Sequence, residues 1–312
     1  MTAKSFANKK KEKYFPLSNI ICISVTLVAL LLSNDMKSGI YEGLIFSFST
    51  IIPTLFPFFI ISDLWSEFFE VKQDSKLQRI FSLLFGINGQ AVGALLSGIV
   101  CGFPIGAKAS ADLYKKKSIT LQELELLSCI SNTPSSAFVI SGIGVGIFGD
   151  IRIGIILYFS VIISSILLGV LFRTQRNKSH FMCNISEQNF NFALSITNAG
   201  LSSVNVASFI IIFSAILKVL KGLINHPLIF ALFASLLEIG NAAKEIANLT
   251  DTSLFSKLLL ISFSLGFSGL SVYFQTLIFL PKEVNLCKYL FRKFIQGIIC
   301  SIVFSFLFLL II

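Results

Sequence analysis

The stretch from Gly98 to Gly149 constrains the fold most, because it is apolar enough to lie at membrane depth yet contains residues that a plain spanning helix does not use. Pro104 and the run 131–134 break helical periodicity, and Lys108 adds charge. Irregular backbone inside a bilayer leaves amide groups unpaired unless it is buried in protein or lines a watery cavity. The stretch therefore predicts interrupted membrane helices around a polar interior.

Composition excludes a soluble globular domain and a disordered chain, since 54% of the 312 residues are hydrophobic and only 13% are charged. Several windows of roughly 17 to 25 mainly apolar residues can each cross about 30 Å of hydrocarbon. The alternating pattern of a membrane β-barrel is absent from the sequence. We predict an all-α polytopic membrane protein with a basic cytoplasmic tail at 1–14 and a single transmembrane domain at 15–312.

About seven spanning helices and two re-entrant hairpins are expected. A polar turn at 34–37 ends the first span, an amphipathic surface helix covers 66–79, and 191–205 is weakly amphipathic. Basic loops occupy 173–190 and 282–293. The spans are predicted at 16–33, 43–65, 121–148, 153–172, 206–220, 257–280 and from 294 to the end, and the hairpins at 80–113 and 222–250.

The two halves of the chain repeat one order of elements. Gly106 lies 26 residues before Asn132, and Gly240 lies 26 residues before Gly266. Each glycine-bearing hairpin is thus followed by a span that is broken at an equivalent place. We interpret residues from about 80 to 172 as the first repeat and from about 191 to 312 as the second.

The distribution of basic residues predicts the orientation. With the first hairpin entering from inside and the second from outside, eighteen of the 25 Lys and Arg residues fall inside, Lys293 among them, and five fall outside. This bias puts the N-terminus in the cytoplasm. The halves are then inverted repeats, whose interface carries the substrate site in many secondary transporters. Because the +9 net charge lies in short loops beside apolar spans, we do not expect nucleic-acid binding.

Several motifs carry a family resemblance: FPFFIISDL, GFPIGAKASADL, SNTPSSAFVISGIGVGIFG, LLEIGNA and GFSGLSVYFQ. Over about residues 40–295 the sequence resembles the nucleoside-recognition (Gate) domain membrane proteins and, within them, the sporulation integral membrane proteins of the YlbJ type. The resemblance implies a fold similar to concentrative nucleoside transporters and a role in moving dipicolinic acid into the forespore. It also implies the bacterial cytoplasmic membrane, with the mother-cell or outer forespore membrane as the specific location. A divergent paralogue with another substrate is the alternative.

In the first half, polar residues of the broken span are candidate substrate ligands, because a helix break exposes amides, carbonyls and hydroxyls together. The alternative is a kink whose hydroxyls bond their own backbone. Lys108 and a helix amino end could attract a carboxylate; the alternative is a lysine that reaches the cytoplasmic interface. The candidates are Ser131, Asn132, Thr133 and Ser135, with Pro104, Gly106 and Lys108 from the hairpin.

In the second half, Glu238 stands with Gly240 and Asn241 in a mostly apolar hairpin. A carboxylate at membrane depth usually faces a cavity or a partner, so cation or proton coupling, or pairing with Lys108 or Lys244, are its candidate roles. A position near the outer interface is the alternative. Ser268 and Gln275 are expected to line the same cavity or to make a helix–helix hydrogen bond.

The leading hypothesis is a transporter or facilitator of a small polar, anionic solute such as dipicolinic acid, with nucleosides as the alternative substrate. The rival is a structural or assembly membrane protein required for sporulation, which would recruit partners through 66–79 or 173–190. We expect no enzyme activity, since no Ser/His, paired Asp or metal cluster is apparent at membrane depth. No cofactor or metal is expected; sodium or proton coupling and a homo-oligomer are left open.

Overall fold

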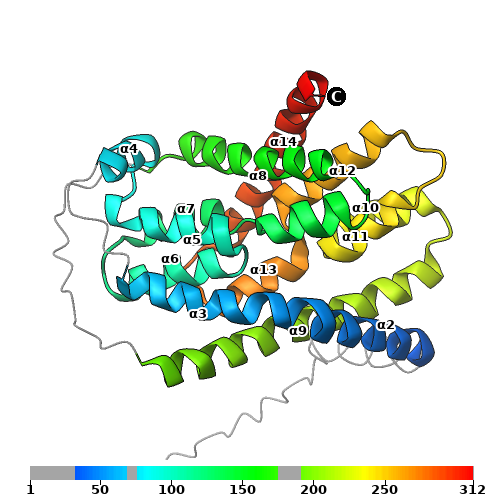
Figure 1. Cartoon of the computed structure of the whole chain (residues 1–312), viewed down its shortest axis with the longest axis horizontal. Coiled ribbons are helices and arrows are strands. Elements are labelled where there is room, and N and C mark those ends of the chain that lie inside the picture. The colour runs from blue at the N-terminus through cyan, green and yellow to red at the C-terminus, as the bar shows by residue number, and fades with distance from the viewer. Residues whose placement is uncertain (1–31, 69–75, 175–190, 312) are drawn as a thin grey trace, which may run out of the picture.

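The computed structural model describes residues 32–68, 76–174 and 191–311, and every regular element in these ranges is helical. Figure 1 shows most of these helices running along the long axis of the molecule. The basic tail and nearly all of the first expected span, 16–33, lie outside the described residues. The all-α prediction is confirmed for the part of the chain that the structure describes.

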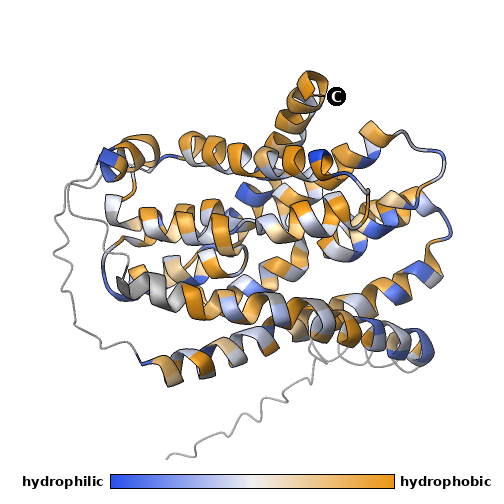
Figure 2. Ribbon diagram, in the orientation of Figure 1, coloured by the Kyte–Doolittle hydropathy of each residue, from blue (hydrophilic) through white to orange (hydrophobic). Residues whose placement is uncertain are grey.

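Within residues 32–68, 76–174 and 191–311, four helical segments are long and apolar enough to cross a membrane. They are α8 (Ile151–Leu171), α9 (Phe192–Leu223), α14 (Leu286–Ile311) and the pair α12 (Leu254–Phe267) and α13 (Gly269–Leu277). Hydrophobic residues, coloured orange, predominate along the helices in Figure 2. The chain is a multi-pass membrane protein.

The first described helical run extends from α2 (Ser33–Phe46) through a π-helical segment, η1 (Ser47–Ile51), into α3 (Ile52–Phe68). The predicted turn at 34–37 is wrong, because these residues form the first turns of α2. Asp35 suits that place, since a carboxylate is favourable near a helix N-terminus. The span predicted at 43–65 therefore begins earlier. The π-helical segment ends just before Pro53, which lacks the amide that a regular ladder needs.

Helix α9 is a single 32-residue helix, so the predicted division into 191–205 and 206–220 is wrong. Its polar residues are spread among apolar ones, and nothing in the segment breaks the hydrogen-bond ladder. At about 1.5 Å per residue it is about 48 Å long, more than the hydrocarbon thickness. It lies along α2, where a Cβ added at Gly39 would stand 2.7 Å from the Cα of Ala215. Such close backbone approach is typical of membrane helix pairs.

The remaining helices form two units with the same order: two short helices, an interrupted helix and a long helix. In Figure 1, α5 to α7 lie toward one end of the long axis and α10 and α11 toward the other. The first unit is α5 (Val92–Cys101), α6 (Ile105–Lys115), α7 (Leu121–Ser131) with the π-helical η3 (Ala137–Val145), and α8; α4 (Lys76–Phe85) and the 3-10 turn η2 (Gly89–Ala91) precede it. The second is α10 (Pro227–Leu237), α11 (Ile239–Ala247), α12 with α13, and α14.

The interruptions recur at the same spacing. From Gly102, which ends α5, to Asn132, which ends α7, the chain advances 30 residues, and it advances 30 again from Glu238 to Ser268. The predicted helix breaks near Pro104, at 132–134 and next to Gly240 are confirmed. The expected break at Gly266 is shifted, because α12 continues to Phe267 and the left-handed residue Ser268 (φ 73°) ends it.

The last helix begins earlier than expected. Helix α14 starts at Leu286, so the loop predicted at 282–293 and the span from 294 are wrong in their boundary. Asn285 gives the reason, since its side-chain oxygen accepts a hydrogen bond from the Lys288 amide (3.0 Å) and so satisfies a free donor at the helix start. Two further turns, including Arg292 and Lys293, therefore belong to α14.

Candidate functional site

In the first unit, the tip of the α5–α6 pair packs on the break that follows α7. A Cβ added at Gly98 or Gly106 would collide with the backbone carbonyl oxygen of Ser131, so only glycine allows this crossing. The Thr133 hydroxyl donates to the Gly98 carbonyl oxygen (3.3 Å), and Gly102 lies against the Ser135 backbone. The break between α5 and α6 therefore lies against the break that follows α7.

The hydroxyl groups at this first break bond mainly to protein backbone. Ser131 Oγ donates to the Leu127 carbonyl (2.7 Å) and lies 3.1 Å from Ser110 Oγ, which itself donates to Gly106 O (2.7 Å). Ser131 thus shows the structural alternative that the sequence left open, a hydroxyl bonded to its own helix backbone, whereas the Thr133 hydroxyl bonds to the backbone of α5. Lys108 is half-buried one turn beyond Pro104, with its amide donating to the Pro104 carbonyl (3.1 Å).

The second unit repeats the arrangement. A Cβ on Gly269 would stand 3.2 Å from the carbonyl oxygen of Leu237, which places the α10–α11 tip against the break between α12 and α13. Ser264 Oγ donates to the Ser235 carbonyl (2.9 Å), tying the same two elements together. Each tip therefore packs on the break that follows it by 30 residues.

Glu238 is the junction between α10 and α11. Its side chain is 7% exposed, and its carboxylate accepts hydrogen bonds from the amides of Gly240 (2.8 Å) and Asn241 (2.7 Å). It ends one helix and caps the next, so the burial of its charge is compensated by two amide donors at a helix N-terminus. Lys244, one predicted partner, lies over the Phe46 ring at 5.0 Å.

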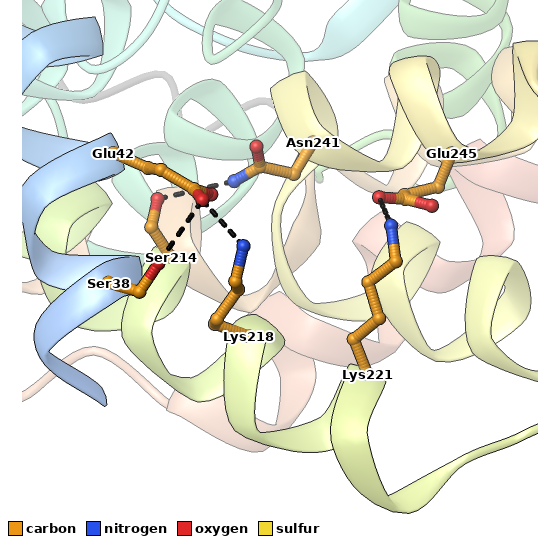
Figure 3. A network of polar contacts seen from close by, with 7 residues as sticks. All are labelled: Ser38, Glu42, Ser214, Lys218, Lys221, Asn241 and Glu245. Carbon is orange, nitrogen blue, oxygen red and sulfur yellow. Dashed lines mark hydrogen bonds and ion pairs between the residues drawn. The ribbon is translucent and has the colours of Figure 1, made fainter. Parts of the chain in front are cut away.

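Asn241 belongs to a polar network that joins α11 to α2 and α9 (Figure 3). Its Nδ2 donates to Ser214 Oγ on α9 (3.2 Å). Two ion pairs flank this contact, Lys218–Glu42 and Lys221–Glu245, each at 2.5 Å. The network fastens the second hairpin to the α2–α9 pair, and this places the Asn241 side chain in a helix–helix contact.

Asn132 connects the two units. Its side chain is fully buried, and Nδ2 lies 2.8 Å from both Thr276 Oγ1 on α13 and the Tyr289 hydroxyl on α14. The backbone carbonyl oxygen of Asn132, which the break leaves without a helical partner, accepts a hydrogen bond from Nζ of Lys293 (3.0 Å). Lys293 Nζ also donates to Gln296 Oε1 (2.7 Å).

Lys293 is the main residue that sequence reasoning misplaced. The charge distribution assigns it to a cytoplasmic loop, whereas the side chain is 1% exposed and lies in α14. Tyr289, Lys293 and Gln296 follow one another at helical spacing, so they share one face of α14, and Tyr289 and Lys293 contact Asn132 at the end of α7. This spacing is the signal in the sequence that could have found them.

The other candidates are buried in the second unit. Gln275 Nε2 donates to Ser271 Oγ (3.1 Å), and both side chains are 2% exposed. Ser268 Oγ donates to the Leu265 carbonyl at 3.4 Å. Ser268 thus directly precedes α13, and Gln275 lies near the end of the same helix. In the described residues no group of three or more His, Cys, Asp or Glu side chains is arranged to hold a metal ion.

Comparison with known proteins relates the chain to a bacterial membrane protein. The chain is 25% identical over 304 aligned residues to the sporulation integral membrane protein YlbJ of Bacillus subtilis strain 168, an alignment that covers 83% of this chain and 74% of that protein. No family model and no solved structure matches the chain. The protein is thus a multi-pass membrane protein related in sequence to a sporulation membrane protein.

Proposed function

We propose that the chain is a transporter or facilitator that moves a small polar, anionic solute across the membrane and has no enzymatic activity. One observation carries the proposal. Two helix breaks in each unit are separated by the same 30 residues and packed on one another. Interrupted helices at membrane depth expose backbone dipoles, and this is how many secondary transporters bind solutes and ions.

The lengths of the short helices support re-entrant hairpins. Helices α5 and α10 have 10 and 11 residues, or about 15 Å, half of the roughly 30 Å of hydrocarbon. Neither can cross alone. Three crossings then separate the two hairpins (α7 with η3, α8, and α9), so the hairpins enter from opposite sides. With the segment 16–33 and the α2–α3 run this makes about seven spans in inverted repeats, similar to concentrative nucleoside transporters.

The proposed substrate class follows from the resemblance. Similarity to a sporulation membrane protein makes dipicolinic acid, a small dicarboxylate, the first solute to test, and nucleosides the second. The proposed ligands are residues at or near the breaks of both units: Pro104, Gly106, Lys108, Ser131, Asn132, Thr133 and Ser135 in the first, and Glu238, Gly240, Asn241, Ser268 and Gln275 in the second. The proposed location is the cytoplasmic membrane with the N-terminus inside, and sodium or protons are the ions to test for coupling.

Uptake by the full chain in proteoliposomes tests the proposal. Radiolabelled dipicolinate is expected to accumulate saturably, and Asn132→Ala to lower the initial rate at least tenfold, because it removes the contacts between the first break and α13 and α14. Asn248→Ala, at an exposed asparagine, is the matched control and should transport normally. Absence of dipicolinate and uridine uptake with sodium, proton or no gradients would refute transport.

A structural or assembly role is the second candidate, favoured by the fact that the Ser131, Thr133 and Asn241 side chains already bond to protein atoms. In that case spore formation should survive substitution of Ser131, Asn132 and Glu238, and fail when segment 66–79 or 173–190 is replaced. The opposite pattern in sporulating cells that carry these variants supports transport.

A further inference from the structure

Lys293 is a buried cation whose described hydrogen-bond partners are both neutral. They are the Asn132 carbonyl oxygen and the Gln296 side-chain oxygen. The nearby carboxylate of Glu125 is engaged elsewhere: Oε1 accepts from the Asn285 amide (3.0 Å), and Oε2 lies 4.0 Å from Arg292 Nη1. Among the described ion pairs, therefore, Glu125 faces Arg292 and Lys293 has no acidic partner.

Such a lysine is costly to the fold. A charge removed from water needs an opposite charge or several hydrogen bonds, and a lysine within a membrane helix usually marks a functional site. Methionine would fill the same space without that cost. The lysine is therefore better explained by a bound anion than by stability.

The hydrogen-bond donors around Nζ point to the same kind of ligand. An ammonium group can only donate, so the Gln296 oxygen must face Nζ, and this fixes the orientation of the amide. The Gln296 nitrogen, Nε2, is then left buried with no hydrogen-bond partner among the described residues. Nζ itself uses two of its three donors. Adjacent unused donors on a cationic and an amide nitrogen suit a group with two negatively charged oxygens.

We infer that Lys293 and Gln296 form a binding site for a carboxylate group of a small organic anion, next to the helix break at Asn132. The two carboxylate oxygens accept hydrogen bonds from Nζ and Nε2, and the charge of Lys293 is neutralised. The inference rests on the proposed transport function only for the route by which the anion reaches this buried place. The inferred site adds α14, which is neither a hairpin helix nor an interrupted helix, to the proposed ligand-binding residues.

Ligand-dependent thermal stabilisation of the purified full chain in detergent tests the site. The probes are dipicolinate, benzoate and the uncharged pyridine-2,6-dicarboxamide. We expect the carboxylates to raise Tm and the diamide to leave it unchanged. Lys293→Met should lower carboxylate affinity about tenfold or more, the loss of one charge-assisted contact. Lys257→Met is the matched control, since Lys257 also donates to a backbone carbonyl (Ala247, 2.8 Å), and it should bind normally.

Three results on the unmodified chain would overturn the inference without relying on any variant: no response to either carboxylate, equal responses to acid and diamide, or a response to chloride alone. Unchanged carboxylate affinity in Lys293→Met would also overturn it. The uptake assay separates this site from transport. Carboxylate binding that requires Lys293 without any uptake keeps the site and refutes transport, whereas uptake that survives Lys293→Met refutes the site and keeps transport.

Discussion

Gly98 and Gly93 lie on the same short helix, α5, but their surroundings differ completely. A Cβ at Gly98 would meet the backbone carbonyl of Ser131, which cannot rotate away, whereas nothing lies within 4 Å of a Cβ built at Gly93. We therefore expect Gly98→Ala to lower the free energy of unfolding by about 2–3 kcal/mol through overpacking. Gly93→Ala should raise it by about 0.5–1 kcal/mol, because alanine favours helix.

Thermal unfolding of the two variants in the same detergent measures this difference. Equal Tm values for Gly98→Ala and Gly93→Ala would mean that α5 does not cross α6 and α7 at Gly98. The pairing of the first hairpin with its break would then be wrong, and the symmetry with the second unit would be lost.

The α10–α11 hairpin depends on one side chain at its junction. Glu238 accepts hydrogen bonds from two amides of α11, and it is buried, so its removal leaves donors that water cannot readily satisfy. Glu238→Ala should cost about 2–3 kcal/mol in unfolding free energy, and Glu238→Gln less, because one acceptor oxygen remains. Ser253→Ala, which removes an exposed cap of α12, is the control and should cost about 1 kcal/mol.

Chemical unfolding monitored by circular dichroism ranks the three variants. A Glu238→Ala protein as stable as Ser253→Ala would show that the carboxylate does not hold the hairpin together. A Glu238→Gln protein with normal stability but no uptake would instead assign the charge of Glu238 to transport.

Helix breaks are predictable from this sequence, whereas long-range partners are not. Proline, glycine and clustered small polar residues interrupt a helix locally, so the ends of α5, α7 and α10 follow from neighbouring residues. The continuity of α9 does not follow from neighbouring residues. In a membrane, the bilayer and the neighbouring helices decide whether scattered serines and asparagines leave a helix intact. The hydrogen bond from Lys293 to Asn132 joins residues 161 positions apart, and charge counting assigns Lys293 to a cytoplasmic loop.

The whole molecule combines a continuous pair with two interrupted units. The α2–α3 run and α9 pack along each other, while the first hairpin lies toward one end of the long axis and the second toward the other (Figure 1). The α2–α9 contact is made by backbone at Gly39 and Gly43, which permits little adjustment. The second hairpin, by contrast, contacts α9 through polar side chains, the Lys221–Glu245 ion pair and the Asn241–Ser214 hydrogen bond. The hairpin's other side is apolar, since Ala231, Ala242 and Ile246 are fully buried in the hydrophobic core that it shares with α8 and α12.

The orientation of the hairpins gives a prediction for the whole chain. If the hairpins enter from opposite sides, the loop after α6 and the loop after α11 lie on opposite faces of the membrane. In a cysteine-free background, Lys116→Cys and Lys282→Cys should react with an impermeant maleimide in inside-out vesicles only, and Thr250→Cys in right-side-out vesicles only. All three positions are exposed, so accessibility within the protein does not limit the reaction. Labelling of Lys116→Cys and Thr250→Cys from one side would place both hairpins on the same face, and the two units could not then be inverted repeats.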